Sequence, residues 1–143
     1  MRYPEQLIIP MREDLTRHGI EEARTPEEVD DVLLNPNRGT VMMVVNSVCG
    51  CAAAKARPGV VEALKHSVKP ARVATVFAGG DVEAVARVRE LASPLPPSSP
   101  CVLLFRDGKP VYLLPRNQIE NKQATEIAQA LQKAFDEHCQ ARG

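Results

Sequence analysis

The sequence predicts one α/β domain over residues 1–143, with a central mixed β-sheet, helices on both faces and extra N-terminal helices. Three apolar, β-branched runs have the length and the continuous character of strands that are buried on both faces. These runs span residues 40–46, 72–78 and 101–105. Segments of helical composition separate them, which implies parallel pairing. Asp107-Gly108 lies between two apolar runs and indicates a closing hairpin, which adds an antiparallel pair.

Two helices are expected before the first strand. Residues 5–18 carry apolar side chains at the spacing of one helix face. These side chains are Leu7, Ile8, Met11 and Leu15. A second helix is predicted to begin at Thr25, because Thr is a good N-cap and Pro26 suits the first helical position. Glu28 stands three residues after Thr25 and completes a capping box.

The rest of the chain alternates between strands and helices. Residues 52–65 have a helical composition that is interrupted at Pro58-Gly59. Asp81 is expected to cap the helix that follows it. Residues 111–114 form the returning strand of the hairpin, and residues 121–139 carry one apolar stripe of a final helix. The resulting sheet is mixed and covered by helices on both faces.

Composition excludes several classes of function. Lys plus Arg and Asp plus Glu both count 18, so the formal net charge is zero. A surface for nucleic acid or for an anionic membrane needs a basic excess, and 3% aromatic residues are too few for base stacking. There is no signal-peptide pattern, and no stretch approaches the roughly 20 apolar residues that span a bilayer. We therefore expect a cytosolic protein whose four cysteines serve chemistry, metal binding or core packing.

Cys49 and Cys51 lie where a buried strand ends and a helix begins. Sites in open α/β sheets tend to lie at this carboxyl end of the strands. Free amide groups and the positive dipole end of a helix N-terminus favour thiolate over thiol, and the thiolate is the attacking species in disulfide exchange. Cys51 could then resolve a mixed disulfide formed on Cys49. Gly50 tolerates unusual backbone angles and would help close a small, strained and readily reduced ring.

Two other interpretations of the cysteine pair stay open at this point. Free cysteines are among the most buried residues, so the pair could simply open a helix within the core. Alternatively, Cys49 and Cys51 could bind a metal with Cys101, Cys139 or His138 from elsewhere in the chain. A second close Cys/His pair at finger-type spacing is missing, apart from the adjacent His138-Cys139. The position of the cysteine pair favours redox chemistry over both the core-packing and the metal-binding interpretations.

The segment from Ser99 to Gly108 resembles the part of thioredoxin in which a cis-proline opens the strand before the closing hairpin. The resemblance implies a thioredoxin-like fold in which Pro100 faces the redox cysteines and helps seat the extended backbone of a substrate. Trans is the commoner state of any X–Pro bond. Pro58 is similar to the kinking proline of the active-site helix of thioredoxin. The site itself departs from thioredoxin, because Cys-Gly-Cys replaces Cys-x-x-Cys.

A narrower resemblance covers nearly the whole chain. Its motifs are residues 46–53 (NSVCGCAA), 8–12 (IIPMR), 75–79 (TVFAG), 97–100 (PSSP), 119–120 (IE) and 134–139 (AFDEHC). Together they resemble the bacilliredoxins, bacterial thioredoxin-like proteins with a Cys-Gly-Cys site. The resemblance implies removal of bacillithiol, a low-molecular-weight thiol, from mixed disulfides on client proteins. By it Cys49 is the nucleophile, Cys51 is the resolving cysteine, and no bound cofactor or metal is needed.

The residues expected to contact substrate are Gly50, Ser99, Pro100 and Cys101. Cys101 departs from the family pattern, in which a small residue such as Ser follows the proline. It could be a core thiol, an alternative resolving cysteine or a third metal ligand. Cys139 is expected to be a packed or frayed terminal thiol.

Charged and polar residues around the cysteines carry weaker expectations. Arg116 and Arg12 could contact an anionic thiol. Lys55 and Arg57 are more simply interpreted as a solvated helix face. Asn46 and Ser47, which end the strand before the cysteines, could orient the cysteine loop.

Two rival functions follow from the same residues. One is a protein disulfide isomerase or reductase that uses the same pair with another protein as the leaving group. The other is a metal-binding protein that uses Cys49, Cys51 and Cys101. The oligomeric state is not predicted by any feature of the sequence.

Overall fold

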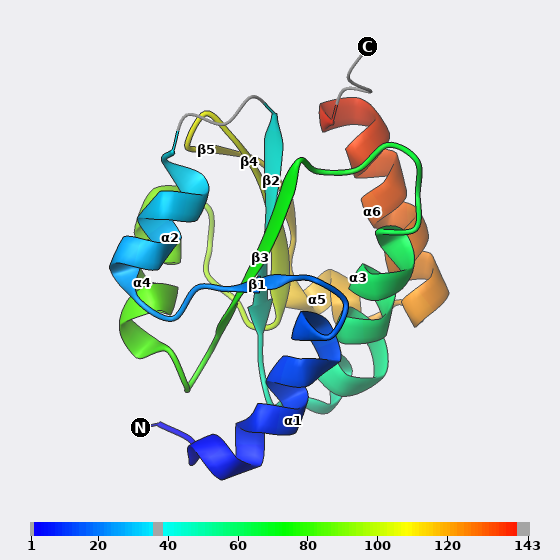
Figure 1. Ribbon diagram of the computed structural model, residues 1–143. Coiled ribbons are helices and arrows are strands. Elements are labelled where there is room, and N and C mark those ends of the chain that lie inside the picture. The colour runs from blue at the N-terminus through cyan, green and yellow to red at the C-terminus, as the bar shows by residue number, and fades with distance from the viewer. Residues whose placement is uncertain (1, 36–38, 140–143) are drawn as a thin grey trace.

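The computed structural model describes residues 2–35 and 39–139 and confirms the predicted thioredoxin-like α/β class. A five-stranded mixed sheet runs through the molecule, with helices on both of its faces (Figure 1). The helices are α1 (Glu5–Thr16), α2 (Pro26–Leu33), η1 (Ala52–Ala56), α3 (Arg57–Ala63), α4 (Val82–Ala92), α5 (Arg116–Glu120) and α6 (Ala124–His138). The strands are β1 (Glu21–Glu22), β2 (Thr40–Asn46), β3 (Arg72–Phe77), β4 (Cys101–Arg106) and β5 (Lys109–Leu114).

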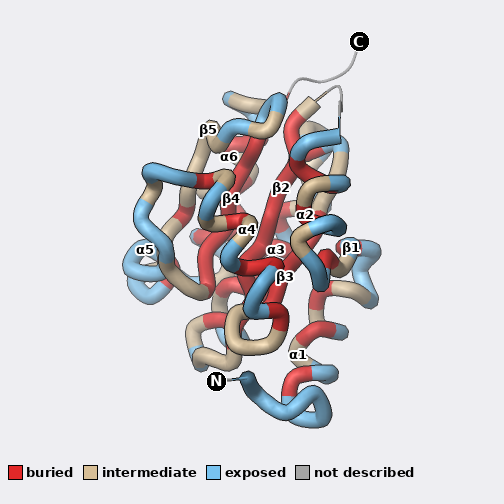
Figure 2. Tube along the Cα trace, turned by 90° about the vertical axis from the view of Figure 1, so that its left-hand side faces the viewer, coloured by how far each residue is buried: buried red, intermediate tan, exposed pale blue. Residues whose placement is uncertain are grey.

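Strand β2 lies in the middle of the sheet, whose order is β1-β3-β2-β4-β5. It pairs in parallel with β3 and in antiparallel with β4, so both of its edges are occupied. All seven of its residues are buried, as its continuous apolar run predicts, and Figure 2 shows it inside the fold. The loop that leaves β2 therefore emerges between the end of β3 and the start of β4.

Two helical layers bury the two faces of the sheet. Side chains alternate along β2, so Met42 and Val44 face α3 and α6, whereas Met43 and Val45 face α2 and α4. Figure 1 shows these two pairs of helices on opposite sides of the sheet, with α1 across the end where the cysteines lie. Within the described residues, no helix is both long enough and apolar enough to cross a lipid bilayer.

The helix after the cysteines differs from the prediction of an interruption at Pro58-Gly59. Five residues, Ala52–Ala56, form a π-turn, and the amide of Arg57 donates to the carbonyl of Ala52 five residues earlier. Proline has no amide hydrogen, and its ring crowds the carbonyl four residues before it, so a wider turn accommodates Pro58. The regular helix then continues without interruption to Ala63. The irregularity thus precedes the proline.

A buried ion pair fastens α1 to the turn between β3 and α4. The Arg12 guanidinium donates to both carboxylate oxygens of Asp81, at 2.9 and 2.8 Å, and lies over the Phe77 ring. Asp81 also accepts from the amide of Phe77 at 3.0 Å and makes no side-chain cap on α4. Arg12 is therefore engaged in a structural ion pair. Asp81 is the N-cap residue of α4, as expected, but its side chain binds Arg12 and the Phe77 amide instead of a helix amide.

The N-terminal arm, residues 2–4, lies along the same turn. The amide of Tyr3 donates to the carbonyl of Gly79 at 2.7 Å, and Arg2 pairs with Glu83 at 2.6 Å. Gly79 has φ +84°, and a Cβ there would lie 2.6 Å from the Tyr3 ring. A glycine is thus required at this position by its backbone angle and by the aromatic side chain against it.

Helices α3 and α6 approach each other at Gly59. A Cβ on Gly59 would lie 2.6 Å from Cγ2 of Ile127 and 3.1 Å from the carbonyl oxygen of Ala124. In Gly59→Ala, we expect overpacking of about 1–3 kcal/mol to outweigh the gain of about 1 kcal/mol in helix propensity. The free energy of unfolding, measured by urea titration, should therefore fall. Gly50→Ala is the control, because a Cβ on Gly50 meets nothing within 4 Å. Unchanged stability of Gly59→Ala would contradict the close approach of α3 and α6.

Candidate functional site

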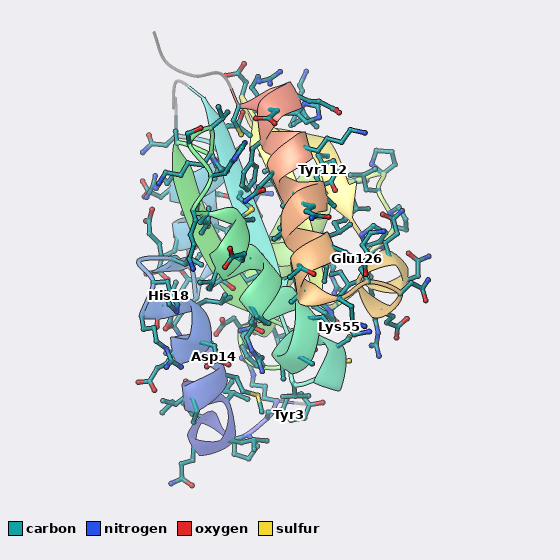
Figure 3. All side chains as sticks on the ribbon, turned by 90° about the vertical axis from the view of Figure 1, so that its right-hand side faces the viewer. Tyr3, Asp14, His18, Lys55, Tyr112 and Glu126 are labelled. Carbon is teal, nitrogen blue, oxygen red and sulfur yellow. The ribbon has the colours of Figure 1, made fainter. Side chains whose placement is uncertain are left out.

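Cys49 lies at the carboxyl end of β2 and at the start of the following helix. The helix begins at Gly50, and the Cys49 carbonyl accepts from the amides of Ala52 and Ala53 at 2.9 and 3.2 Å. The side chain is half-buried and lines one cleft with Tyr3, which is labelled in Figure 3. This is the location that the strand and helix patterns predict, with free helix amides beside the sulfur.

The two sulfur atoms of the cysteine pair are in contact, 2.8 Å apart. A hydrogen bond from the Cys51 thiol is the largest cause that lowers the pKa of Cys49, and the Cys51 amide and the Arg116 charge act in the same direction. Burial raises the pKa of Cys51, and its bond to Cys49 raises it further. The arrangement therefore favours thiolate on Cys49 and thiol on Cys51.

A cleft of about 410 Å³ opens beside Cys49. The cleft is lined by Tyr3, Ser47, Val48, Cys49, Ala78, Gly79, Ser99 and Arg116. Strand order explains its two walls: Gly79 follows β3 on one side of β2, whereas Ser99 precedes β4 on the other. Arg116 is the one charged side chain among the described residues that line the cleft. A bound molecule would therefore meet a thiolate flanked by an aromatic wall and a cationic wall.

The peptide bond between Ser99 and Pro100 is cis, as the thioredoxin resemblance implies. Pro100 is buried, while Ser99 lines the cleft. Arg116 is held against this segment, because its guanidinium donates to the Ser99 carbonyl at 3.3 Å and its amide donates to Ser98 Oγ at 3.2 Å. Ser99 and Arg116 thus form one connected wall of the cleft, which Pro100 does not line.

Cys101 lies apart from the other two cysteines. Its side chain is 4% exposed and packs in the apolar cluster that contains α2 and α4, and burial raises its pKa to about 11. Among the described residues, no three Cys, His, Asp or Glu side chains come together as metal ligands. Cys101 is therefore a core thiol in this structure and does not join Cys49 and Cys51.

Cys139 is packed at the far end of the molecule. It is 4% exposed and follows His138, whose carbonyl accepts from Thr40 at 2.7 Å. Thr40 is the first residue of β2, whereas the cysteine pair follows its last residue. The expectation of a packed terminal thiol is thus confirmed, and burial raises the pKa of Cys139.

Gly50 is exposed, and its backbone is not in the left-handed region. The expectation that Gly50 helps to close a Cys49–Cys51 disulfide concerns the oxidised form and stays a prediction, because both cysteines are free thiols here. A Cβ would point into open space, with no atom within 4 Å. The absence of a side chain therefore leaves the two sulfur atoms open to approach from outside.

Arg57 contradicts the expectation of a solvated helix face, because only 4% of the residue is exposed. Its guanidinium donates to the side-chain oxygen of Asn46 and to the carbonyl of Ser47, both at 3.0 Å. Lys55 is half-buried, and it donates to the carbonyl of Glu120. The periodicity of the sequence does not predict the different burial of these two cations. The π-turn, which ends just before Arg57, changes the direction of the Arg57 side chain.

Comparison with known proteins places the chain in one family. Residues 3–139 match the family described as disulphide isomerase. A bacilliredoxin of Koribacter versatilis is 51% identical over 139 residues, which is 97% of this chain and 95% of that protein. A bacilliredoxin of Cytophaga hutchinsonii is 50% identical, covering 94% of this chain and 98% of that protein, and one of Salinibacter ruber is 49% identical, covering 97% and 82%. The chain therefore belongs to the bacilliredoxin family of thiol–disulfide oxidoreductases.

Proposed function

We propose that this protein removes bacillithiol from mixed disulfides on client proteins in the cytosol, with Cys49 as nucleophile and Cys51 as resolving thiol. The observation that carries the proposal is the contact between the two sulfurs, 2.8 Å apart, with the pKa of Cys49 lowered and that of Cys51 raised. The first thiol is thereby primed to attack, and the second holds its proton until the mixed disulfide has formed.

The reaction proceeds in two exchange steps. The Cys49 thiolate attacks the bacillithiol sulfur of the client disulfide, forms a Cys49–bacillithiol disulfide and releases the client as a thiolate that takes up a proton. Cys51 then loses its proton and attacks Cys49 Sγ, which forms the Cys49–Cys51 disulfide and expels bacillithiol as a thiolate. A dithiol reductant or two equivalents of a small thiol supply the two electrons that restore the pair.

The cleft beside Cys49 supports a small anionic thiol as the group removed. Arg116 faces the cleft, and the positive charge that it places there acts on both sulfurs. Bacillithiol carries carboxylates, which a guanidinium at the cleft wall attracts. Gly50, Ser99 and Pro100 remain as contacts for the client backbone in this proposal, whereas the burial of Cys101 argues against direct contact with substrate.

The disulphide isomerase description of the matched family favours a second candidate, the rearrangement of protein disulfides by the same pair. In isomerisation the mixed disulfide on Cys49 is attacked by another client thiol instead of by Cys51. Isomerase activity therefore survives loss of Cys51. Complete reduction of the client disulfide, which leaves the enzyme with a Cys49–Cys51 disulfide, does not survive it.

Cys51→Ala should trap the intermediate. After reaction with a bacillithiol-modified client protein, we expect intact-mass analysis to show bacillithiol on Cys49 and a freed client. The resolving step needs a second thiol, so the adduct should persist in the variant and disappear in the native protein. Cys101→Ala is the matched control and should behave as the native protein, because Cys101 is buried. An unmodified Cys49, or an adduct on Cys101, would contradict the assigned roles.

Arg116→Gln should weaken the reaction most for an anionic adduct. We expect a loss of about fivefold in kcat/KM for a bacillithiol-modified client, because Arg116 would make an exposed ion pair with its carboxylates. A client modified with uncharged 2-mercaptoethanol should lose less. Lys55→Gln is the control, since Lys55 is also a cation close in sequence to the pair but does not line the cleft. Equal losses for the two adducts would show that Arg116 does not recognise the small thiol.

A further inference from the structure

We infer that Arg57 is a positioning residue for the nucleophile: its buried guanidinium holds the loop Asn46-Ser47 and, through it, fixes the backbone of Cys49. The inference deepens the proposed function, because it rests on Cys49 being the reactive thiol.

The first link is between Arg57 and the end of β2. One guanidinium nitrogen, Nη1, lies 3.0 Å from both Asn46 Oδ1 and the Ser47 carbonyl oxygen. All three residues are buried, with exposures of 4%, 1% and 7%. Hydrogen bonds from a charged donor in such surroundings are stronger than those on the surface, and a buried acceptor left unpaired is costly.

The second link runs from these residues to Cys49. Asn46 Oδ1 also accepts from the amide of Ser47 at 2.8 Å, and its Nδ2 donates to the carbonyl of Met11 at 3.0 Å. Ser47 Oγ in turn accepts from the amide of Cys49 at 2.9 Å. A continuous series of hydrogen bonds therefore connects Arg57 to the backbone of the nucleophile.

The third element is the charge that keeps Arg57 in place. Asp14 of α1, labelled in Figure 3, puts Oδ2 3.0 Å from Arg57 Nε. Burial lowers the pKa of Arg57, and the Asp14 carboxylate acts in the opposite direction. Asp14 and Arg57 also line a second cleft, of about 400 Å³, together with Arg17, His18 and Glu62.

The π-turn explains how a residue eight positions after Cys49 reaches back beneath the loop. Each residue of an α-helix turns the side-chain direction by about 100°, and a π-turn inserts an extra residue before the regular helix resumes. Arg57 is the residue whose amide closes that turn, and it is buried, whereas Lys55 within the turn is only half-buried. The turn that Pro58 requires thus also aims the guanidinium.

Loss of these contacts should act on the reactivity of Cys49 as well as on stability. The contact with Cys51 and the free helix amides lower the pKa of Cys49 only while the loop holds its geometry. Alkylation of Cys49 by iodoacetamide, followed by peptide mass mapping, measures the pH midpoint of the thiol. In Arg57→Met we expect this midpoint to rise toward the ordinary thiol value of about 8.5. Once the midpoint lies above pH 7, the thiolate fraction at pH 7 falls about tenfold for each further unit by which the midpoint rises.

Matched variants separate positioning from simple stabilisation. Arg72→Met removes another paired arginine, bound to Glu21 and Asp31 at the opposite end of β3, and should leave the alkylation midpoint unchanged. Arg57→Lys keeps the charge beside Asp14 but lacks the planar fork, so we expect it to restore thermal stability and leave the midpoint raised. Ser47→Ala removes the acceptor of the Cys49 amide while Arg57 stays intact, and it should also raise the midpoint.

The outcome is decisive even where Arg57→Met does not fold, because Arg57→Lys and Ser47→Ala test the same series of hydrogen bonds. A native midpoint in both of these folded variants would overturn the inference and leave Arg57 a purely structural residue. Alkylation needs neither client nor bacillithiol, so failure of the proposed substrate would not change this result.

Discussion

A guanidinium group that leaves water must find acceptors inside the protein, and Arg57 finds them in the loop that carries the cysteines. Three elements meet at this group: α1 supplies the carboxylate of Asp14, the end of β2 supplies Asn46, and α3 supplies the arginine itself. A shift of α3 or of the end of β2 would separate the buried guanidinium from its acceptors on Asn46 and Ser47. The rigidity of the cysteine loop therefore comes from an electrostatic constraint beneath the loop. The half-exposed thiols need no buried general base of their own.

The topology of the sheet adds the second constraint. Because β2 is paired on both edges, its end is the one place where a loop can emerge with a neighbouring strand on each side. The two walls of the cleft then come from segments far apart in the sequence, the arm around Tyr3 and the segment from Ser99 to Arg116. A molecule attached to Cys49 is consequently surrounded without any dedicated lid or domain. Fold and family place the chain among thiol–disulfide oxidoreductases, and the proposed preference for an anionic thiol rests on the lining of the cleft.

How much the sequence could predict follows from the range of the interactions involved. Strand β2, the Thr25 cap and the hairpin at Asp107-Gly108 depend on local patterns, and all three were predicted. Ser99-Pro100 was predicted as cis only through a resemblance, because no local pattern selects that isomer. The two-residue β1 and five-residue α5 are too short to show a periodicity, and neither was predicted. The burial of Arg57 depends on a π-turn and on a carboxylate 43 positions away. No pattern in a single sequence reveals that these two features occur together.

The arm before α1 bears on how the protein is handled in the laboratory. Tyr3 contributes to the wall of the cleft, and its ring occupies the space that Gly79 leaves free. An affinity tag fused at the amino end would enter next to this wall and compete with client proteins for the same surface. Helix α6 ends at the opposite end of β2, as its contact with Thr40 shows, so a tag on that side would leave the entrance clear. Kinetic comparisons between preparations are therefore meaningful only when the amino-terminal residues are identical.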